Sequence, residues 1–160
     1  MTKKLVVGWF SFTCSEDSTI LFTELLNDHF DDWKSLLEFR HVKSLKTNNS
    51  LEGLDVAFVE GAISSPRQET EVKKIRGKAK YVVAIGSCAC TGQPSNSRND
   101  LDPAKASEKM RWYFERFEYS PRVKKLSDVI KVDKEVDGCP MNPDKFIEAL
   151  QFYLKLEGVV

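Results

Sequence analysis

The sequence has no excess of charge of either sign. Its 24 lysine and arginine residues are balanced by 24 aspartate and glutamate residues, which gives a formal net charge of +0. A protein that binds nucleic acid or an anionic membrane through its overall field carries a clear positive excess. We therefore expect neither a nucleic acid nor a membrane surface among its partners.

Long apolar runs are also missing. No segment reaches the roughly eighteen apolar residues of a membrane-spanning helix. The apolar run Leu5 to Phe10 near the N-terminus is followed by polar residues from Ser15 to Ser18, without a small-residue cleavage site or a twin-arginine signal. We therefore expect a cytoplasmic protein that does not insert into a membrane.

Cysteine is scarce, with four residues in a chain of 160. Cytoplasmic thiols are kept reduced, so these cysteines are better interpreted as core residues, metal ligands or catalytic groups than as disulfides. The fold must therefore rest on a hydrophobic core, for which a content of 41% hydrophobic residues is ample.

Apolar runs rich in β-branched residues alternate along the chain with stretches of helical periodicity. We predict strands at Leu5–Phe10, Phe39–Val42, Asp55–Val59, Tyr81–Ile85 and Val129–Val132. We predict helices from a cap at Ser18 or Thr19 to Leu37, and at Arg67–Lys78, Ala104–Phe117 and Pro143–Leu156. This alternation favours a flavodoxin-like α/β fold, with a doubly wound, mostly parallel five-stranded sheet in a single domain over residues 1–160.

The cysteines follow the ends of predicted strands. Cys14 comes after the first strand, Cys88 and Cys90 after the fourth, and Cys139 after the fifth. Ligands of an open parallel sheet bind at this carboxyl edge. A single cytosolic cysteine is more often a small core residue, but none of the four lies within a strand or on an apolar helical stripe. The joint pattern therefore favours a metal site.

Thiolate-rich sites suit zinc or an iron–sulfur cluster. Structural zinc usually draws on paired Cys-x-x-Cys knuckles in small folds with little core. Here the cysteines are dispersed and the core is ample. Single cysteines beside glycines, where backbone N–H groups can approach bridging sulfides, fit an iron–sulfur cluster better.

Four segments then carry a resemblance to a known family. They are Val6–Trp9, Phe58–Ile63, Gly86–Ala89 and Gly138–Asp144, in this order along nearly the whole chain. In these segments the chain resembles the small, electron-transferring subunit of nickel–iron hydrogenases, which is related to the 20-kDa iron–sulfur subunit of respiratory complex I. The resemblance implies a domain that holds one proximal four-iron, four-sulfur (4Fe-4S) cluster.

In that family the cluster takes two cysteines from the loop after the first strand, one from a Gly-Ser-Cys-Ala segment and one from a Gly-Cys-Pro segment. Cys14, Cys88 and Cys139 match three of these ligands. The first loop departs from the pattern. The family has either Cys-x-x-Cys or adjacent cysteines, whereas here Ser11 precedes Cys14 by three residues and Ser15 follows it. One expected thiolate is therefore missing.

The fourth ligand stays open. Our first choice is Cys90, although residues two apart in a turn point in different directions unless the backbone bends. Ser15 or Ser11 can instead supply an oxygen, and the site can also hold a three-iron (3Fe-4S) cluster or none.

Two carboxylates also match the family. The resemblance implies a role for Glu16 in proton transfer at the large-subunit interface, and the alternative is a helix-start carboxylate favoured by the helix dipole. Glu60 ends the third predicted strand and in the family lies beside the cluster. Its alternative is a buried carboxylate that accepts hydrogen bonds from loop amides.

The resemblance implies an electron-transfer subunit of a cytosolic nickel–iron hydrogenase-like complex. Its partners would be the large subunit, where the hydrogen chemistry occurs, and further electron-transfer subunits, so this chain alone is not expected to turn over hydrogen. Two alternatives stay open. One is a scaffold subunit of the same complex without a cluster, which the missing thiol favours. The other is a complex-I-like subunit that reduces quinone, for which a basic amphipathic segment would be expected and is not found.

Overall fold

The computed structural model describes residues 3–102 and 105–160. Five strands form one sheet: β1 Leu5–Ser11, β2 Leu37–Val42, β3 Leu54–Glu60, β4 Ala79–Ile85 and β5 Lys134–Val136. Neighbouring strands are parallel throughout, in the order β2-β1-β3-β4-β5. The predicted flavodoxin-like, doubly wound fold class is confirmed.

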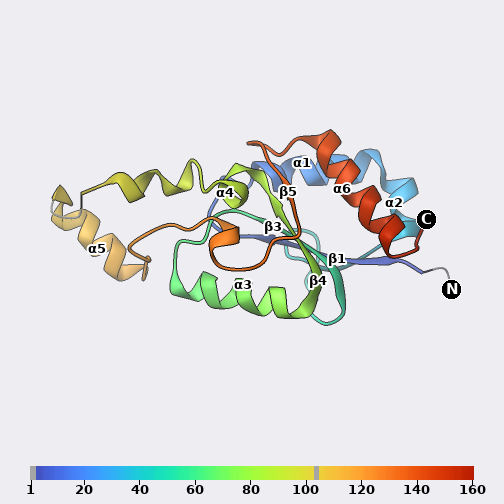
Figure 1. Ribbon diagram of the computed structural model, residues 1–160, viewed down its shortest axis with the longest axis horizontal. Helices are drawn as coiled ribbons and strands as arrows, with labels where there is room; N and C mark the ends of the chain where they lie inside the picture. Colours follow the sequence, from blue (N-terminus) through green and yellow to red (C-terminus); the bar gives the residue numbers. More distant parts are fainter. Residues whose placement is uncertain (1–2, 103–104) are drawn as a thin grey trace.

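Helices cover both faces of the sheet (Figure 1). On one face lie α1 (Asp17–Asp28), α2 (Phe30–Leu36) and α6 (Pro143–Leu156), and on the other lie α3 (Pro66–Lys78) and the 3₁₀-helix η3 (Leu126–Asp128). The five-residue helix α4 (Gly86–Cys90) follows β4 directly. The 3₁₀-helix η1 (Ser95–Asp100) and α5 (Glu108–Arg116) extend away from the sheet at one end of the molecule.

The core has one layer on each side of the sheet. On the side of α1 and α6, Trp9 stacks on Phe22 with ring centroids 4.3 Å apart, and Phe146 meets both rings edge-on. On the side of α3, Ile75 and Leu126 are fully buried. Each such buried apolar side chain stabilises the fold by about 2 kcal/mol. All residues of β3 are buried, as expected for the central strand of a parallel sheet.

The prediction of one long helix that ends at Leu37 is wrong in two respects. His29, with φ −105° and ψ 15°, separates α1 from α2, and Leu37 is already the first residue of β2. The predicted caps are also wrong, because α1 begins at Asp17. Glu16 is its N-cap residue, with a φ of 63° and no side-chain capping hydrogen bond.

The prediction of the fifth strand at Val129–Val132 is wrong. These apolar residues follow η3 and pack beneath the sheet with the α3 layer, so they are core residues without being strand residues. Asp133 then accepts a hydrogen bond from the Val82 amide at 2.8 Å, and β5 begins at Lys134.

The predicted helix Ala104–Phe117 is shorter, at Glu108–Arg116, and its first predicted residue lies outside the described residues. Its apolar side does not pack on the core, because no residue of α5 is buried. Among the described residues, no helix combines the length and the apolar character that crossing a membrane requires.

The strand order reverses between β1 and β3. From β1 the chain goes to β2 on one side and then returns to β3 on the other. At such a switch point the loops after the two central strands diverge and leave a crevice at the carboxyl edge, which is where open α/β sheets bind their ligands.

Candidate metal centre

Three of the four cysteines lie at this carboxyl edge. Cys14 lies in the loop after β1, Cys88 in α4 directly after β4, and Cys139 in the loop between β5 and α6. Cys14 packs against the small buried cluster that contains Cys88. The Ser87 amide, next to Cys88, donates to the carbonyl of Gly138, next to Cys139, at 2.8 Å. We call Cys14, Cys88 and Cys139 the thiol edge.

Desolvation and negative charge favour the protonated form of two of these thiols. Burial raises the pKa of Cys14 to about 11, and the charges of Glu60 and Cys88 add to this effect. The hydrogen bond to Asp17, followed by burial, raises the pKa of Cys139. A bound metal centre would lower the pKa of these thiols, because a coordinating thiol is deprotonated.

Each thiol of the edge has a polar partner. The Cys14 Sγ lies 3.5 Å from the Ser11 Oγ, and the Cys88 Sγ lies 3.2 Å from the Ser95 Oγ. The Cys139 thiol donates to Asp17 Oδ2 at 3.5 Å. Hydrogen bonds to sulfur orient ligands and tune the potential of an iron–sulfur centre, so these contacts suit such a site.

A tight turn fixes Cys139 relative to Cys88. Gly138 has a φ of +124°, and a Cβ placed on it would lie 2.5 Å from the Pro140 carbonyl oxygen, so only glycine fits. Its own carbonyl accepts the Ser87 amide at 2.8 Å, and the Ser87 hydroxyl donates to Asp137 at 2.7 Å. Two loops that are distant in sequence are thereby held together.

Cys90 is not brought to the thiol edge. It belongs to the core layer on the side of α3, and its Sγ donates to the Ala84 carbonyl at 3.7 Å. Burial raises its pKa to about 12, helped by the charges of Glu135 and Asp137. Residues two apart on a helix point in nearly opposite directions, and Cys88 packs instead with Ala62 in a separate cluster that Cys14 joins.

The two serines considered as oxygen ligands do lie at the edge. Ser11 contacts the Cys14 thiol and also donates to Glu16 Oε1 at 3.0 Å. The Ser15 side chain partly offsets the raised pKa of the Cys139 thiol. Both positions at which the resemblance implies an additional cysteine, Ser11 and Ser15, therefore carry a hydroxyl.

Glu60 caps helix α1 from a distant strand. Its side chain is 3% exposed and accepts the Ser18 amide at 3.1 Å and the Thr19 hydroxyl at 2.6 Å. Thr19 in turn accepts the Trp9 indole N–H at 2.8 Å. This carboxylate supplies the cap that Glu16 does not, and its negative charge lies at the positive end of the helix.

Ser95 lies in a polar stretch whose composition is typical of a surface loop, and the sequence does not single it out. In the structure its hydroxyl contacts Cys88 and donates to the Thr13 carbonyl at 3.2 Å. It thereby links the Cys14 loop to α4. No local sequence signal marks this role, since the contacts to Thr13 span 82 residues.

The three thiols of the edge are donors of the kind that iron–sulfur clusters use. Within residues 3–102 and 105–160, no three His, Cys, Asp or Glu side chains lie close enough to hold one metal ion. A cluster of several irons binds each ligand through a different iron and so accepts ligands that are farther apart. Three thiols with hydrogen-bonded sulfurs fit such a group, and the fourth ligand position has no thiol.

The family model described as "NADH ubiquinone oxidoreductase, 20 Kd subunit" matches residues 14–153, which include all four cysteines. The chain belongs to this family. The resemblance to this family and to the hydrogenase small subunits that share it is therefore confirmed. The matched residues include three of the four motif segments, all except Val6–Trp9.

Relatives with 30% identity belong to hydrogenases. One is the gamma chain of the coenzyme F420 hydrogenase of Methanosarcina barkeri, 30% identical over 171 residues, covering 99% of this chain and 58% of the relative. Another comes from the F420-non-reducing hydrogenase of Methanothermobacter marburgensis, 30% identical over 137 residues, covering 76% of this chain and 44% of the relative. The chain thus spans about half the length of these relatives.

Solved structures share the fold. An NAD⁺-reducing [NiFe]-hydrogenase in the H₂-reduced state matches with a TM-score of 0.78 and 18% identity, covering 95% of this chain and 92% of that one. The actinobacterial-type NiFe-hydrogenase from Ralstonia eutropha H16 matches with a TM-score of 0.65 and 18% identity, covering 99% of this chain and 55% of that one. At this identity the matches establish the architecture alone.

Proposed function

We propose that this family member is the electron-transfer small subunit of a nickel–iron hydrogenase-like complex and carries one iron–sulfur cluster at the thiol edge. The observation that carries the proposal is that Cys14, Cys88 and Cys139, from two loops and helix α4, lie at the same carboxyl edge of the sheet. A bound cluster would supply one-electron transfer there. The hydrogenase names of the relatives support the choice of complex.

The proposed ligands are the three thiols, with the Ser11 hydroxyl beside Cys14 as the candidate for the fourth. Cys90, the first choice from sequence, stays an untested prediction. To reach the edge it would have to leave the core and its contact with Ala84, and α4 would have to unwind. Ser11 needs no such rearrangement, since its oxygen already lies 3.5 Å from Cys14 Sγ. A 4Fe-4S cluster with one oxygen ligand and a 3Fe-4S cluster are both compatible with this donor set.

The chain's own residues would hold and tune the centre. Ser95 and Ser11 orient the sulfurs of Cys88 and Cys14 through their hydroxyls. Glu60 fixes the first turn of α1, which follows the Cys14 loop. Glu16 accepts a hydrogen bond from Ser11, so a proton-relay role at the partner interface stays part of the proposal.

The partner would be a nickel–iron large subunit, with further electron-transfer subunits beyond it, and we expect the complex in the cytoplasm, where thiols stay reduced. Cys139 is exposed, and a cluster at the edge would be open to oxidation unless a partner covers it. The hydrogen chemistry is assigned to the large subunit.

A scaffold subunit without a cluster is the second candidate. The observation in its favour is that the described residues bring only three thiols to the edge. It predicts a chain that joins the complex but contains no iron.

Anaerobic co-expression with the large subunit of the same genome tests both candidates. We expect a brown complex with about three to four irons in this chain and matching labile sulfide. Stoichiometric zinc in a colourless chain would refute the cluster, and a colourless, metal-free chain in an intact complex would establish the scaffold.

A further inference from the structure

Glu16 has a backbone conformation that its place in the fold does not explain. Its φ of 63° lies in the left-handed region, which residues other than glycine adopt only at a cost in free energy. Glu16 is the N-cap residue of α1, yet its side chain makes no capping hydrogen bond, and the Glu60 carboxylate accepts the Ser18 amide instead. Residues held in such conformations concentrate at functional sites. The Glu16 side chain therefore calls for a role outside the helix.

The Glu16 carboxylate contacts Ser11, the candidate for the fourth ligand. Ser11 Oγ donates to Glu16 Oε1 at 3.0 Å and lies 3.5 Å from Cys14 Sγ. A hydroxyl has one hydrogen and two acceptor lone pairs. Because Ser11 gives its hydrogen to Glu16, the Cys14 thiol is the donor in the second contact. Glu16 thus makes Ser11 an acceptor, and not a donor, toward the thiol edge.

The loop that carries Cys14 is fixed at both ends by Glu60. Glu60 pairs with Ser11 in the sheet, and its carbonyl accepts the Phe12 amide at 2.9 Å. Its carboxylate accepts the Ser18 amide at the start of α1. A ligand whose supporting residues are held in this way needs little rearrangement of the main chain when it binds.

The two side chains have room to follow a bound cluster. Ser11 and Glu16 are exposed, and Cys14 is half-buried. Ligands of one cluster bind different irons, so the 3.5 Å contact between Ser11 and Cys14 opens when both are ligands. The hydrogen bond between Ser11 and Glu16 can be kept during this rotation, because neither side chain is packed in the core.

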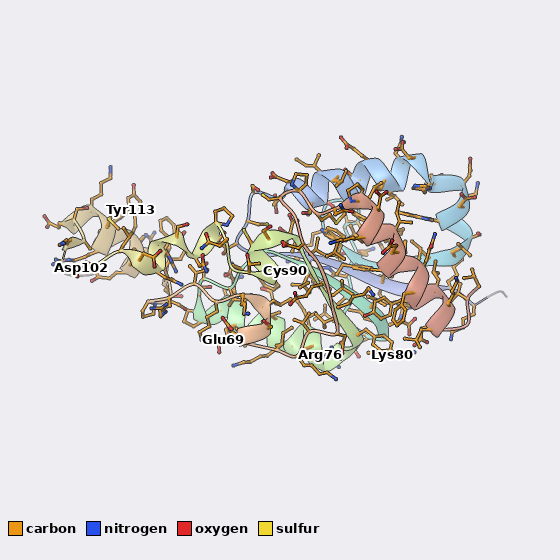
Figure 2. All side chains as sticks on the ribbon, turned by 45° about the horizontal axis from the view of Figure 1, so that its top comes forward. Glu69, Arg76, Lys80, Cys90, Asp102 and Tyr113 are labelled. Carbon is orange, nitrogen blue, oxygen red and sulfur yellow. The ribbon has the colours of Figure 1, made fainter. Side chains whose placement is uncertain are left out.

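The other candidates lie differently. Cys90 lies inside the body, in the core layer on the side of α3 (Figure 2). Moving it to the thiol edge would leave a cavity in that layer. Ser15 follows Cys14 directly and is exposed like Ser11, so it is the natural comparison for Ser11.

We propose that Glu16 is a positioning residue for the fourth ligand: it holds the Ser11 hydroxyl hydrogen, so that a lone pair of Ser11 Oγ faces the cluster. The inference rests on the proposed function and selects 4Fe-4S from its two cluster types. Metal binding deprotonates Cys14, and without Glu16 the Ser11 hydroxyl would turn and donate to that thiolate. Ligation uses only a lone pair of Ser11; the hydrogen stays in the bond to Glu16, and no electron is transferred.

Variants of Ser11 and Glu16 test the proposal in the anaerobically purified, co-expressed complex. Glu16→Gly removes the carboxylate and suits the positive φ, so the chain should stay folded. Glu118→Gly is its matched control, because Glu118 is also exposed and has a φ of 52°. Ser15→Ala is the control for Ser11→Ala. The readouts are iron, labile sulfide and the electron paramagnetic resonance signal of the cluster.

We expect about four irons and four sulfides in the wild-type cluster. Glu16→Gly and Ser11→Ala should lose about one iron without loss of sulfide and should show the signal of an oxidised three-iron cluster. The Glu118 and Ser15 variants should match wild type. Glu16→Gln keeps an acceptor oxygen and should therefore keep the fourth iron.

A double variant separates positioning from a general effect on the loop. Ser11→Cys supplies a thiolate, whose lone pairs need no hydrogen-bond acceptor to be exposed. Combined with Glu16→Gly, it should therefore keep the fourth iron. If this double variant lost the fourth iron, Glu16 would act on the whole loop and the positioning role would be wrong.

Two other results would overturn the inference and leave the proposed function standing. One is a three-iron cluster in the wild type, and the other is an intact four-iron cluster in Glu16→Gly. Loss of the fourth iron in Ser15→Ala, with none in Ser11→Ala, would assign the position to Ser15 and also overturn it. A wild-type complex without any iron–sulfur signal would overturn the proposed function as well.

Discussion

Removing the Glu60 side chain should destabilise the protein through helix α1, which it caps from β3. Glu60→Ala would remove two hydrogen bonds to a buried carboxylate, from the Ser18 amide and the Thr19 hydroxyl, and would leave both donors unsatisfied. Buried hydrogen bonds to a charged group contribute about 1.5 to 3 kcal/mol each, and a helix cap about 1 kcal/mol. Because both bonds serve the same helix turn, we expect a loss of about 3 kcal/mol.

Glu60→Gln separates charge from packing. The amide keeps the size of the side chain and one acceptor oxygen, so we expect a loss of only about 1 kcal/mol. The free energies of unfolding come from urea titrations of the cluster-free protein. In thermal scans the Ala variant should melt about 9 °C below wild type.

Glu148→Ala, on the exposed side of α6, is the matched control and should change the free energy of unfolding by less than about 0.5 kcal/mol. If Glu60→Ala matched that control, the cap would contribute nothing. If Glu60→Gln were as destabilising as Glu60→Ala, the ionised carboxylate, not its hydrogen-bond geometry, would be the important feature.

Two further predictions concern His41 and Asn99. Burial lowers the pKa of His41 below its ordinary 6.5, so as the pH falls the unfolded chain takes up a proton before the folded protein does. The free energy of unfolding should therefore decrease as the pH falls below about 6.5. Urea titrations of His41→Phe at pH 5.5 to 7.5 should lack this part of the pH dependence. The Asn99 side chain hydrogen-bonds to both the amide and the carbonyl of Val123, at 2.7 Å and 2.8 Å. Asn99→Ala should therefore make residues 93–102 and 105–122 more sensitive to limited proteolysis, whereas Asn48→Ala should not. Equal cleavage of the two variants would contradict an anchoring role for Asn99.

The fold was predictable because its signals are periodic and repeated. Alternating apolar runs and helical stripes indicate the parallel sheet, and α3 and α6 begin with a proline that follows a capping residue, Ser65 or Asn142. The displaced fifth strand shows the limit of this reasoning. Apolar β-branched residues suit a buried turn as well as a strand, and the hydrogen bond between Asp133 and Val82, which positions β5, joins residues 51 apart.

The shared sheet edge of three cysteines was predictable, and their role as cluster ligands stays a prediction. The positions of Cys14, Cys88 and Cys139 after three strands were enough to expect them at one edge. The orientation of Cys90 was not predictable in the same way, because residues 86–90 form a helix whose opposite sides face the edge and the core. The cap by Glu60 depends on a contact over 42 residues, which no local pattern reveals.

The most direct test of the thiol edge is the iron and labile sulfide content of Cys88→Ala and Cys90→Ala, purified anaerobically beside wild type. Cys90→Ala removes one core sulfur at a cost of about 1 kcal/mol, so the protein should stay folded and keep its iron and its electron paramagnetic resonance signal. Cys88→Ala should lose at least about half of the iron, because it removes one of three thiolate ligands. Equal loss of iron in the two variants would make Cys90 a ligand and contradict the account, as would wild-type protein that contains no iron after anaerobic assembly.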